Sequence, residues 1–378
     1  MEQNKFCSQA GMGSFFLSGL CSVSTGIVVA QLQAEYGFSY ELMGTLLSLF
    51  NIGNLAAGFL TGLLPAALGT RATILLLGAG YAVGYALMGL TGAVAALLGG
   101  FLMVGLAKGC AINTCTILVG DHVPDRTKGM NLMHGCFACG AFLSPFILQL
   151  AGRISSMAGI FVLATLGLVL WLLFAFVPLE DSKKEKRKAI DWSFLKNRHF
   201  WLLTGLIFCQ NGTESSVSGW VVTYFKDTGL ISPAVSPFTV SIMWGTMLAV
   251  RFLLAFVFPV KNKHRVLLLM SIGCFVFYTG MMLFSGQILS PLLLFAFALS
   301  IAGLNPTAVS DAGNMMTPAG MGVMLPVASL ANIIMQVIIG AVSENVSLRA
   351  GMGMITIPCL GMVCFAAALL FKDRKKTA

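Results

Sequence analysis

The sequence carries little charge. Charged residues make up only 10% of its 378 residues, whereas 57% are hydrophobic and the mean hydropathy is +0.88. Soluble domains typically contain about 25% charged residues. The polar segments that remain are too short to form a soluble domain, so we do not expect a conventional enzyme. The composition instead predicts an all-α membrane protein.

Several functional motifs are also missing. No Walker loop, HExxH or GxSxG motif occurs, so nothing supports ATP-driven pumping or hydrolysis. No metal site is predicted, because His134 has no second ligand at a plausible spacing, and the Cys136 and Cys139 pair is assigned to helix packing. Nucleic-acid binding is not expected, since the basic residues lie at the ends of apolar segments and not on a folded domain.

What the sequence does contain is a series of long apolar segments. A helix needs about 20 residues to cross a bilayer. Twelve segments approach this length, at 12–33, 41–64, 72–92, 93–120, 130–151, 157–178, 198–225, 236–259, 266–286, 288–311, 317–341 and 349–371.

The positions of the basic residues predict an orientation. With the N-terminus inside, 18 of the 23 Lys and Arg residues fall on the cytoplasmic side of these segments. An excess of this kind is typical of cytoplasmic loops. We therefore expect a multi-pass protein with both termini in the cytoplasm. We also expect it to lie in the lipid bilayer of a bacterial cytoplasmic membrane and to work there as a monomer.

The segments divide into two sets of six. The charged stretch 179–197 is interpreted as a cytoplasmic linker between one six-helix bundle at 1–178 and a second at 198–378. Three landmarks recur in the two halves at offsets of 192, 194 and 195 residues: Gly37 and Gly229, Arg71 and Arg265, and Gly78 and Gly273. Many secondary transporters consist of such repeats, with the solute site between them. The predicted fold is therefore twelve transmembrane helices in two pseudo-symmetric bundles.

Glu214 is an acidic residue in the middle of the seventh segment. A charge at the centre of a bilayer costs about 2.5–3.5 kcal/mol on insertion scales, so the side chain should face protein or water. On a helix, Gln210, Asn211, Glu214 and Ser218 fall within about 100° of one another. They form a polar stripe, which argues for a path through the membrane.

This layout resembles the major facilitator superfamily over nearly the whole chain. The family's loop 2–3 motif is commonly written G-x-L-x-D-R-x-G-R-R, and Gly62–Arg71 keeps its glycines, its Leu and its final Arg but has Ala at the Asp and Arg positions. Finer matches are similar to the fucose–galactose–glucose/proton symporter branch. They comprise Phe15–Leu20 with Ala34–Ser39, Asn131–Gly135 with Gly140 and Pro145, Gly212 and Glu214 with Gly219, Trp220 and Tyr224, Pro306–Ser310, and Gly340–Glu344.

The chain departs from that branch where proton coupling is concerned. The resemblance implies acidic residues in the first and fourth spans, but Gly26 and Gly109 occupy those places. Glu214 is left as the acid well inside the bilayer. Lys108, near the centre of the fourth segment, is a candidate solute contact or partner for Glu214, with a fixed charge that stabilises helix packing as the alternative.

Other polar residues complete the candidate site. Amides with a nearby aromatic ring suit a polyhydroxylated solute, because each hydroxyl needs a hydrogen-bond partner and each sugar face a ring. The alternative for each residue is hydrogen bonding between helices. The solute-binding or coupling candidates are Glu214, Lys108, Asn211, Gln210, Trp220, Tyr224, Asn131, His134, Asn305, Asn332, Gln336 and Asn54. Arg251, Arg71 and Asp311 are gating candidates, and Asp311 is also interpretable as an acid close to water at the end of its span.

These observations favour a secondary active transporter that moves a small polar solute, a sugar or sugar-like metabolite, by alternating access. No cofactor is expected apart from a coupling proton or sodium ion acting through Glu214. Two alternatives stay open: a carrier of organic anions or exporter of amphipathic compounds on the same fold, and a membrane sensor that no longer transports.

Overall fold

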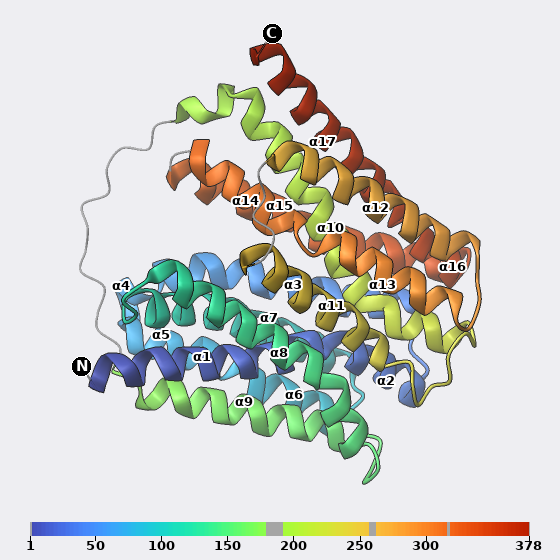
Figure 1. Cartoon of the computed structure of the whole chain (residues 1–378). Coiled ribbons are helices and arrows are strands. Elements are labelled where there is room, and N and C mark those ends of the chain that lie inside the picture. Colours follow the sequence, from blue (N-terminus) through green and yellow to red (C-terminus); the bar gives the residue numbers. More distant parts are fainter. Residues whose placement is uncertain (1, 179–191, 257–261, 316–317, 378) are drawn as a thin grey trace. The chain divides into compact units, whose positions relative to one another are not determined.

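The computed structural model describes residues 2–178, 192–256, 262–315 and 318–377, and all the regular secondary structure in these ranges is helical (Figure 1). The elements are α1 (Glu2–Val23), α2 (Thr25–Tyr36), α3 (Tyr40–Leu63), α4 (Pro65–Leu68), α5 (Thr70–Gly78), α6 (Gly80–Leu90), α7 (Val94–Gly120), α8 (Arg126–Ala151), α9 (Ala158–Phe176), the 3-10 helix η1 (Trp192–Lys196), α10 (Arg198–Asp227), α11 (Phe238–Phe256), α12 (Lys263–Leu283), α13 (Leu289–Ile301), α14 (Leu304–Met315), α15 (Pro318–Asn345), α16 (Leu348–Gly353) and α17 (Thr356–Thr377).

Each of the twelve predicted segments coincides with a helix or with two consecutive helices. Ten helical stretches among the described residues are long and apolar enough to cross a membrane. The other two are α10, whose polar stripe lowers its hydropathy, and α11, whose described apolar part, Phe238–Leu254, is shorter. The all-α membrane fold is thus confirmed, with two spans that differ from the ten in polarity or length.

Four of the predicted segments are interrupted by a turn. The breaks lie at Ser24 between α1 and α2, at Ala79 between α5 and α6, at Ala302–Gly303 between α13 and α14, and at Met354–Ile355 between α16 and α17. A turn inside a span withdraws backbone groups from the helical hydrogen-bond ladder, and these groups need other partners.

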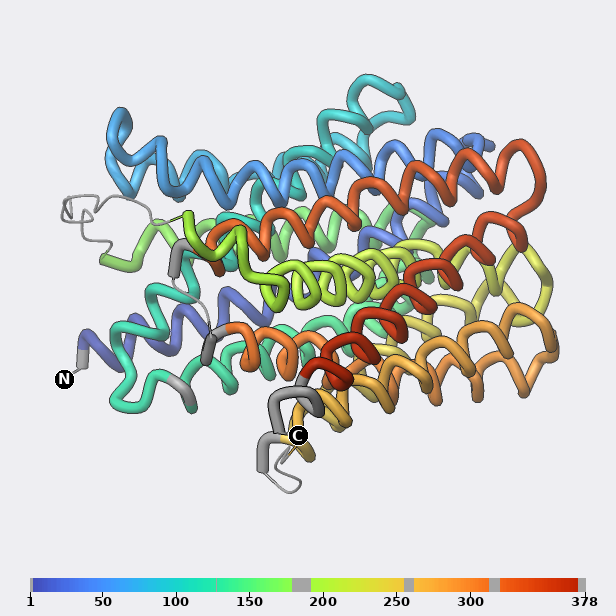
Figure 2. Tube along the Cα trace, turned by 90° about the horizontal axis from the view of Figure 1, so that it is seen from above, coloured from blue at the N-terminus to red at the C-terminus, as the bar shows by residue number. Residues whose placement is uncertain are grey.

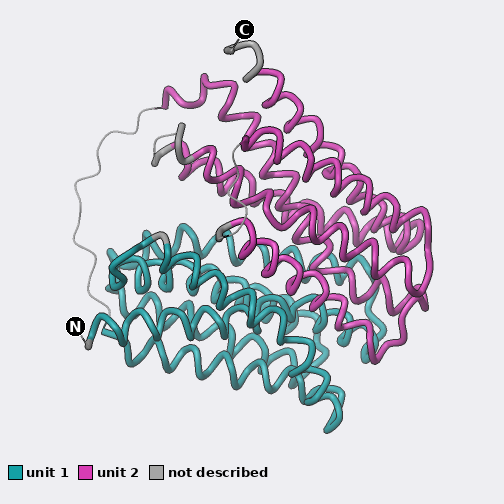
Figure 3. Tube along the Cα trace, viewed as in Figure 1, with its two compact units in different colours: residues 1–185 teal, residues 186–378 magenta. Residues whose placement is uncertain are grey.

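The chain divides into two compact units, Met1–Glu185 and Lys186–Ala378 (Figure 3). The division falls inside the stretch 179–197 that was interpreted as a linker. Residues 179–191 of that stretch lie outside the described residues, and Trp192–Lys196 forms η1.

The two units repeat the same packing order (Figures 1 and 2). In unit 1, α1 packs on α8, α3 on α7, and α6 on α9. The corresponding spans of unit 2 pair in the same way, α10 on α15, α11 on α13, and α12 on α17. The duplication inferred from three landmarks in the sequence therefore extends to the arrangement of the helices within each unit.

One landmark pair is equivalent in backbone conformation as well. Gly37 ends α2 with φ of 67°, and Gly229 follows the end of α10 with φ of 68°. This left-handed conformation is costly for residues with a Cβ, so glycine is the usual helix-ending residue there. Both glycines mark the end of the first span of their unit, Gly37 as the C-cap of α2 and Gly229 as the residue after the C-cap of α10.

Close helix contact in unit 1 depends on residues without a side chain. A Cβ atom on Gly105 of α7 would collide with the carbonyl oxygen of Phe50 on α3, and one on Gly109 would lie 2.5 Å from the carbonyl oxygen of Asn54. Small residues let helices approach closely where lipid provides no hydrophobic driving force. The contact also explains why Gly109 carries no acid: there is no room for one.

We expect Gly105→Leu to destabilise unit 1 by about 1–3 kcal/mol or more, because the side chain must push α3 away from α7. The measurement is thermal unfolding of the purified protein in detergent. Gly99→Leu on the same helix is the matched control, since a Cβ atom there meets nothing within 4 Å. Equal effects at the two positions would contradict the close packing of α3 and α7.

Candidate functional site in the second unit

The candidate site is built on α10, the 30-residue helix that carries the polar stripe. The helix starts after Asn197, whose side-chain oxygen accepts a hydrogen bond from the backbone N–H of His199 at 2.9 Å, as is typical of an N-cap. Glu214 lies within two residues of the midpoint of the helix. A charged group therefore occurs at mid-depth of a span, where it needs protein or water around it.

Amide groups from two helices join Glu214 in a hydrogen-bonded cluster. The Gln210 amide donates to Glu214 Oε2 at 2.7 Å. The Asn305 amide on α14 donates to Gln210 Oε1 at 2.8 Å and to Asn211 Oδ1 at 3.1 Å. Gln210 is buried, whereas Asn211, Glu214 and Asn305 are half-buried. The half-buried members leave polar atoms accessible for a ligand.

Arg251 on α11 supplies the positive charge of the cluster. Its Nη2 atom lies 3.8 Å from Glu214 Oε2, and its Nε donates to the carbonyl oxygen of Ala302 at 3.1 Å. The side chains of Arg251 and Glu214 are 30% and 21% exposed. Pairing opposite charges lowers the cost of holding either one at this depth. Arg251, predicted as a gating residue, is thus also a neighbour of Glu214.

The sequence around the break in the tenth span explains where Arg251 lies. In a continuous helix the Ala302 carbonyl would accept from the backbone N–H four residues later, but that residue is Pro306, which has none. The Nε–H of Arg251 replaces the missing donor. Pro306 therefore helps to fix the guanidinium beside Glu214.

The opposite side of α10 is tied to α15. The Trp220 indole N–H donates to Gln336 Oε1 at 2.7 Å, and the Gln336 amide donates to the Ser215 carbonyl and hydroxyl oxygens, both at 3.1 Å. Trp220 is 0% exposed and Tyr224 is 1% exposed. Both rings are therefore buried in this structure, and their stacking on a sugar face stays a prediction.

The candidates of unit 1 lie in other environments. Lys108, half-buried near the midpoint of α7, has its Nζ 4.8 Å from the centre of the Phe50 ring. Asn54 is half-buried on α3, whereas Asn131 and His134 are exposed on α8. The His134 ring packs edge-on against the Phe15 ring, with 5.4 Å between the ring centres. Since Lys108 and Glu214 belong to different units, their pairing stays a prediction.

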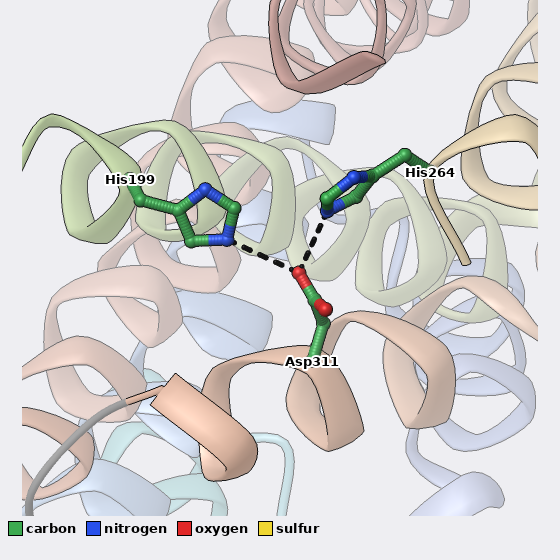
Figure 4. A group of neighbouring side chains, drawn as sticks. All are labelled: His199, His264 and Asp311. Carbon is green, nitrogen blue, oxygen red and sulfur yellow. Dashed lines mark hydrogen bonds and ion pairs between the residues drawn. The ribbon is translucent and has the colours of Figure 1, made fainter. Parts of the chain in front are cut away.

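The remaining candidates lie near helix ends or on other faces. The Arg71 guanidinium donates to the Ala175 carbonyl at 2.7 Å and so caps the last turn of α9. Asn332 is half-buried on α15. Asp311 was expected close to water, but it is buried with 7% exposure and accepts hydrogen bonds from His199 and His264 (Figure 4). That expectation was wrong, because two neighbouring helix starts cover the carboxylate.

Comparisons with known proteins identify relatives of this chain. The sequence pattern of the Major Facilitator Superfamily matches residues 11–318. The chain is 26% identical over 241 residues to the chloroplastic sodium-dependent phosphate transport protein 1 of Arabidopsis thaliana, covering 56% of this chain and 46% of that protein. It is 24% identical over 263 residues to the chloroplastic ascorbate transporter of the same plant, covering 62% and 48%. The chain thus spans about half the length of these relatives.

Solved structures agree with the fold. A crystal structure of a mutant of the nucleoside transporter NupG matches with a TM-score of 0.74 at 13% sequence identity, covering 97% of this chain and 99% of the other. At this identity the match supports the fold alone.

We expect Arg251→Met to destabilise unit 2 by about 1–3 kcal/mol, because it leaves the Ala302 carbonyl without a donor. Pro306→Ala restores a backbone N–H four residues after Ala302, so the same Arg251 substitution should cost less in that background. A double-mutant cycle by chemical unfolding in detergent measures the difference. Additive effects would show that Pro306 does not position Arg251.

Proposed function

The chain belongs to the Major Facilitator Superfamily, and on this basis we propose that it transports a small polar solute across a membrane by alternating access. The similar proteins above are all named as transporters, which favours transport over catalysis. The polar cluster of Gln210, Asn211, Glu214, Arg251 and Asn305 is the observation that carries the proposal. An apolar bundle gains nothing from partly exposed charges at mid-depth unless a ligand or water meets them there.

The solute class follows from the groups that the cluster presents. Glu214 offers carboxylate oxygens, while Asn211 and Asn305 offer amides that both donate and accept. Such a set suits a ligand with several hydroxyl groups, and this supports the proposal of a sugar or sugar-like metabolite. The relatives are named for phosphate, ascorbate and nucleosides, which are also small polar solutes.

Ion coupling through Glu214 is the second part of the proposal. Neutralising the carboxylate by a proton removes the attraction that holds Arg251 at 3.8 Å, while the Ala302 carbonyl continues to hold the Nε atom. The guanidinium is then free to turn its other nitrogens toward a solute or a second anion. Sodium is the alternative coupling ion, bound directly by the carboxylate.

We expect uptake of a sugar or related polyol into proteoliposomes to be faster with an inward pH or sodium gradient. Glu214→Gln should reduce uptake about 10- to 100-fold, because it removes a charge-assisted contact. The measurement is uptake of a panel of labelled sugars, polyols, nucleosides and organic anions. Glu41→Gln is the control, since Glu41 is exposed in the first turn of α3. No uptake of any solute would leave a sensor instead of a transporter.

Lys108 provides a test of the competing substrate class. If the solute is an anion, Lys108→Met should abolish its uptake and leave neutral sugars unaffected, because the ammonium is the half-buried cation at mid-span of unit 1.

If Lys108 and Glu214 act as a coupled pair, their combined replacement by Met and Gln should remove the gradient dependence. Unchanged transport in the double variant would rule out the pair.

A further inference from the structure

Three potential metal ligands meet at one end of unit 2, away from the polar cluster. His199 of α10 and His264 of α12 both direct Nε2 at Asp311 Oδ2 of α14, at 3.2 Å and 2.9 Å (Figure 4). The three ligand atoms lie within 4.8 Å of one another. The residues are 4%, 7% and 7% exposed, so the group is almost completely shielded from bulk solvent.

The local sequence fixes both histidines at equivalent places. Each is the second residue of its helix, and each comes after an Asn N-cap and one basic residue. The two sequences are Asn197-Arg198-His199 and Asn262-Lys263-His264. The Asn262 side chain accepts from the Arg265 N–H at 3.0 Å, just as Asn197 caps α10. Capped helix starts hold the two imidazoles on rigid backbone, which is the condition for a preorganised site.

We propose that His199, His264 and Asp311 form a binding site for a transition-metal dication of the Zn²⁺ type. Imidazole nitrogens and a carboxylate oxygen are ligands that Zn²⁺ prefers. Zinc bonds of about 2.0–2.1 Å in a tetrahedron place neighbouring ligand atoms about 3.3 Å apart. The observed separations of 3.2 Å and 2.9 Å differ from this by only a few tenths of an ångström on the two carboxylate edges, and the edge between the imidazole nitrogens, which lie within 4.8 Å of each other, closes by rotation of the rings.

Binding exchanges protons for the metal. In the hydrogen-bonded form, the Nε2–H groups donate to the carboxylate. For each imidazole to bind, its Nε2 proton must move to Nδ1 or leave to water, which frees the lone pair for the dication. A water molecule supplies the fourth ligand, as in sites with three protein ligands. The Lys263 side chain, next to His264 in the sequence, is directed to Ser310, to whose hydroxyl oxygen it donates at 3.0 Å.

The site is separate from the proposed solute cluster. His199 precedes Glu214 by 15 residues on α10, about 22 Å along its axis, and Asp311 follows Asn305 by six residues on α14, about 9 Å along that helix. A metal there cannot contact the solute, and instead would link the starts of α10 and α12 to α14. The proposal therefore does not depend on the identity of the solute or on transport.

The test uses the full-length protein purified in detergent with a histidine-free affinity tag and stripped of metal by EDTA. We expect calorimetry and elemental analysis to give one Zn²⁺ per chain, with an unfolding midpoint that rises on Zn²⁺ addition and falls back with EDTA. Co²⁺ should give the visible absorption of a nitrogen- and oxygen-ligated tetrahedral site, whereas Mg²⁺, which prefers oxygen ligands, should not bind.

The variants His199→Gln, His264→Gln and Asp311→Asn should each weaken Zn²⁺ binding by about 100-fold or more and abolish the Co²⁺ spectrum. His122→Gln removes a histidine of unit 1 and should leave both signals unchanged. Gel filtration of each metal-free variant checks that it is folded. Absence of stoichiometric Zn²⁺ binding by the unmodified protein, or equal binding by His199→Gln, would overturn the site and leave a hydrogen-bonded His–Asp–His group.

Discussion

The structure depends on one constraint: every backbone polar group at membrane depth must have a partner within the protein. At three of the four broken spans, a side chain from another helix donates to a carbonyl beside the break. Tyr85 donates to the Cys21 carbonyl beside the break between α1 and α2, and Tyr278 donates to the Met352 carbonyl beside the break between α16 and α17. Arg251 does the same for Ala302. The tyrosines occupy positions 193 residues apart, which agrees with the duplication of the two halves.

The Arg251 contact joins this backbone requirement to the chemistry of the cluster. One guanidinium replaces the donor that Pro306 lacks and also offsets the charge of Glu214, so one side chain serves both the backbone of the broken span and the proposed solute cluster. Gln210 and Asn305 then connect Glu214 to the part of the tenth span that follows the break. The broken span and the acidic residue are therefore one connected network, and a change in the charge of Glu214 reaches α14 through it.

Much of the fold could be predicted from the sequence, because hydrophobic length and the positions of punctuating residues determine spans directly. Of the predicted stripe, Gln210, Asn211 and Glu214 meet in one cluster because helical periodicity relates them, whereas the Ser218 hydroxyl is directed to Met243 Sδ. Trp220, six residues after Glu214, lies about 240° around the helix, and the same arithmetic could have placed it away from the stripe. The His199, His264 and Asp311 group could not be found this way, because 65 and 47 residues separate its members and only tertiary packing joins them.

The hydrogen bonds between Trp220, Gln336 and Ser215 have a consequence for how this protein can evolve. They anchor one face of α10 in the core of unit 2, while Asn211 and Glu214 on the other face stay partly accessible. The residues proposed to meet the solute, Asn211 and Glu214, thus lie on a different face of α10 from Trp220, which is tied to α15. A substitution at the partly exposed face can therefore alter what that face binds while the hydrogen bonds of Gln336 to Trp220 and Ser215 are kept.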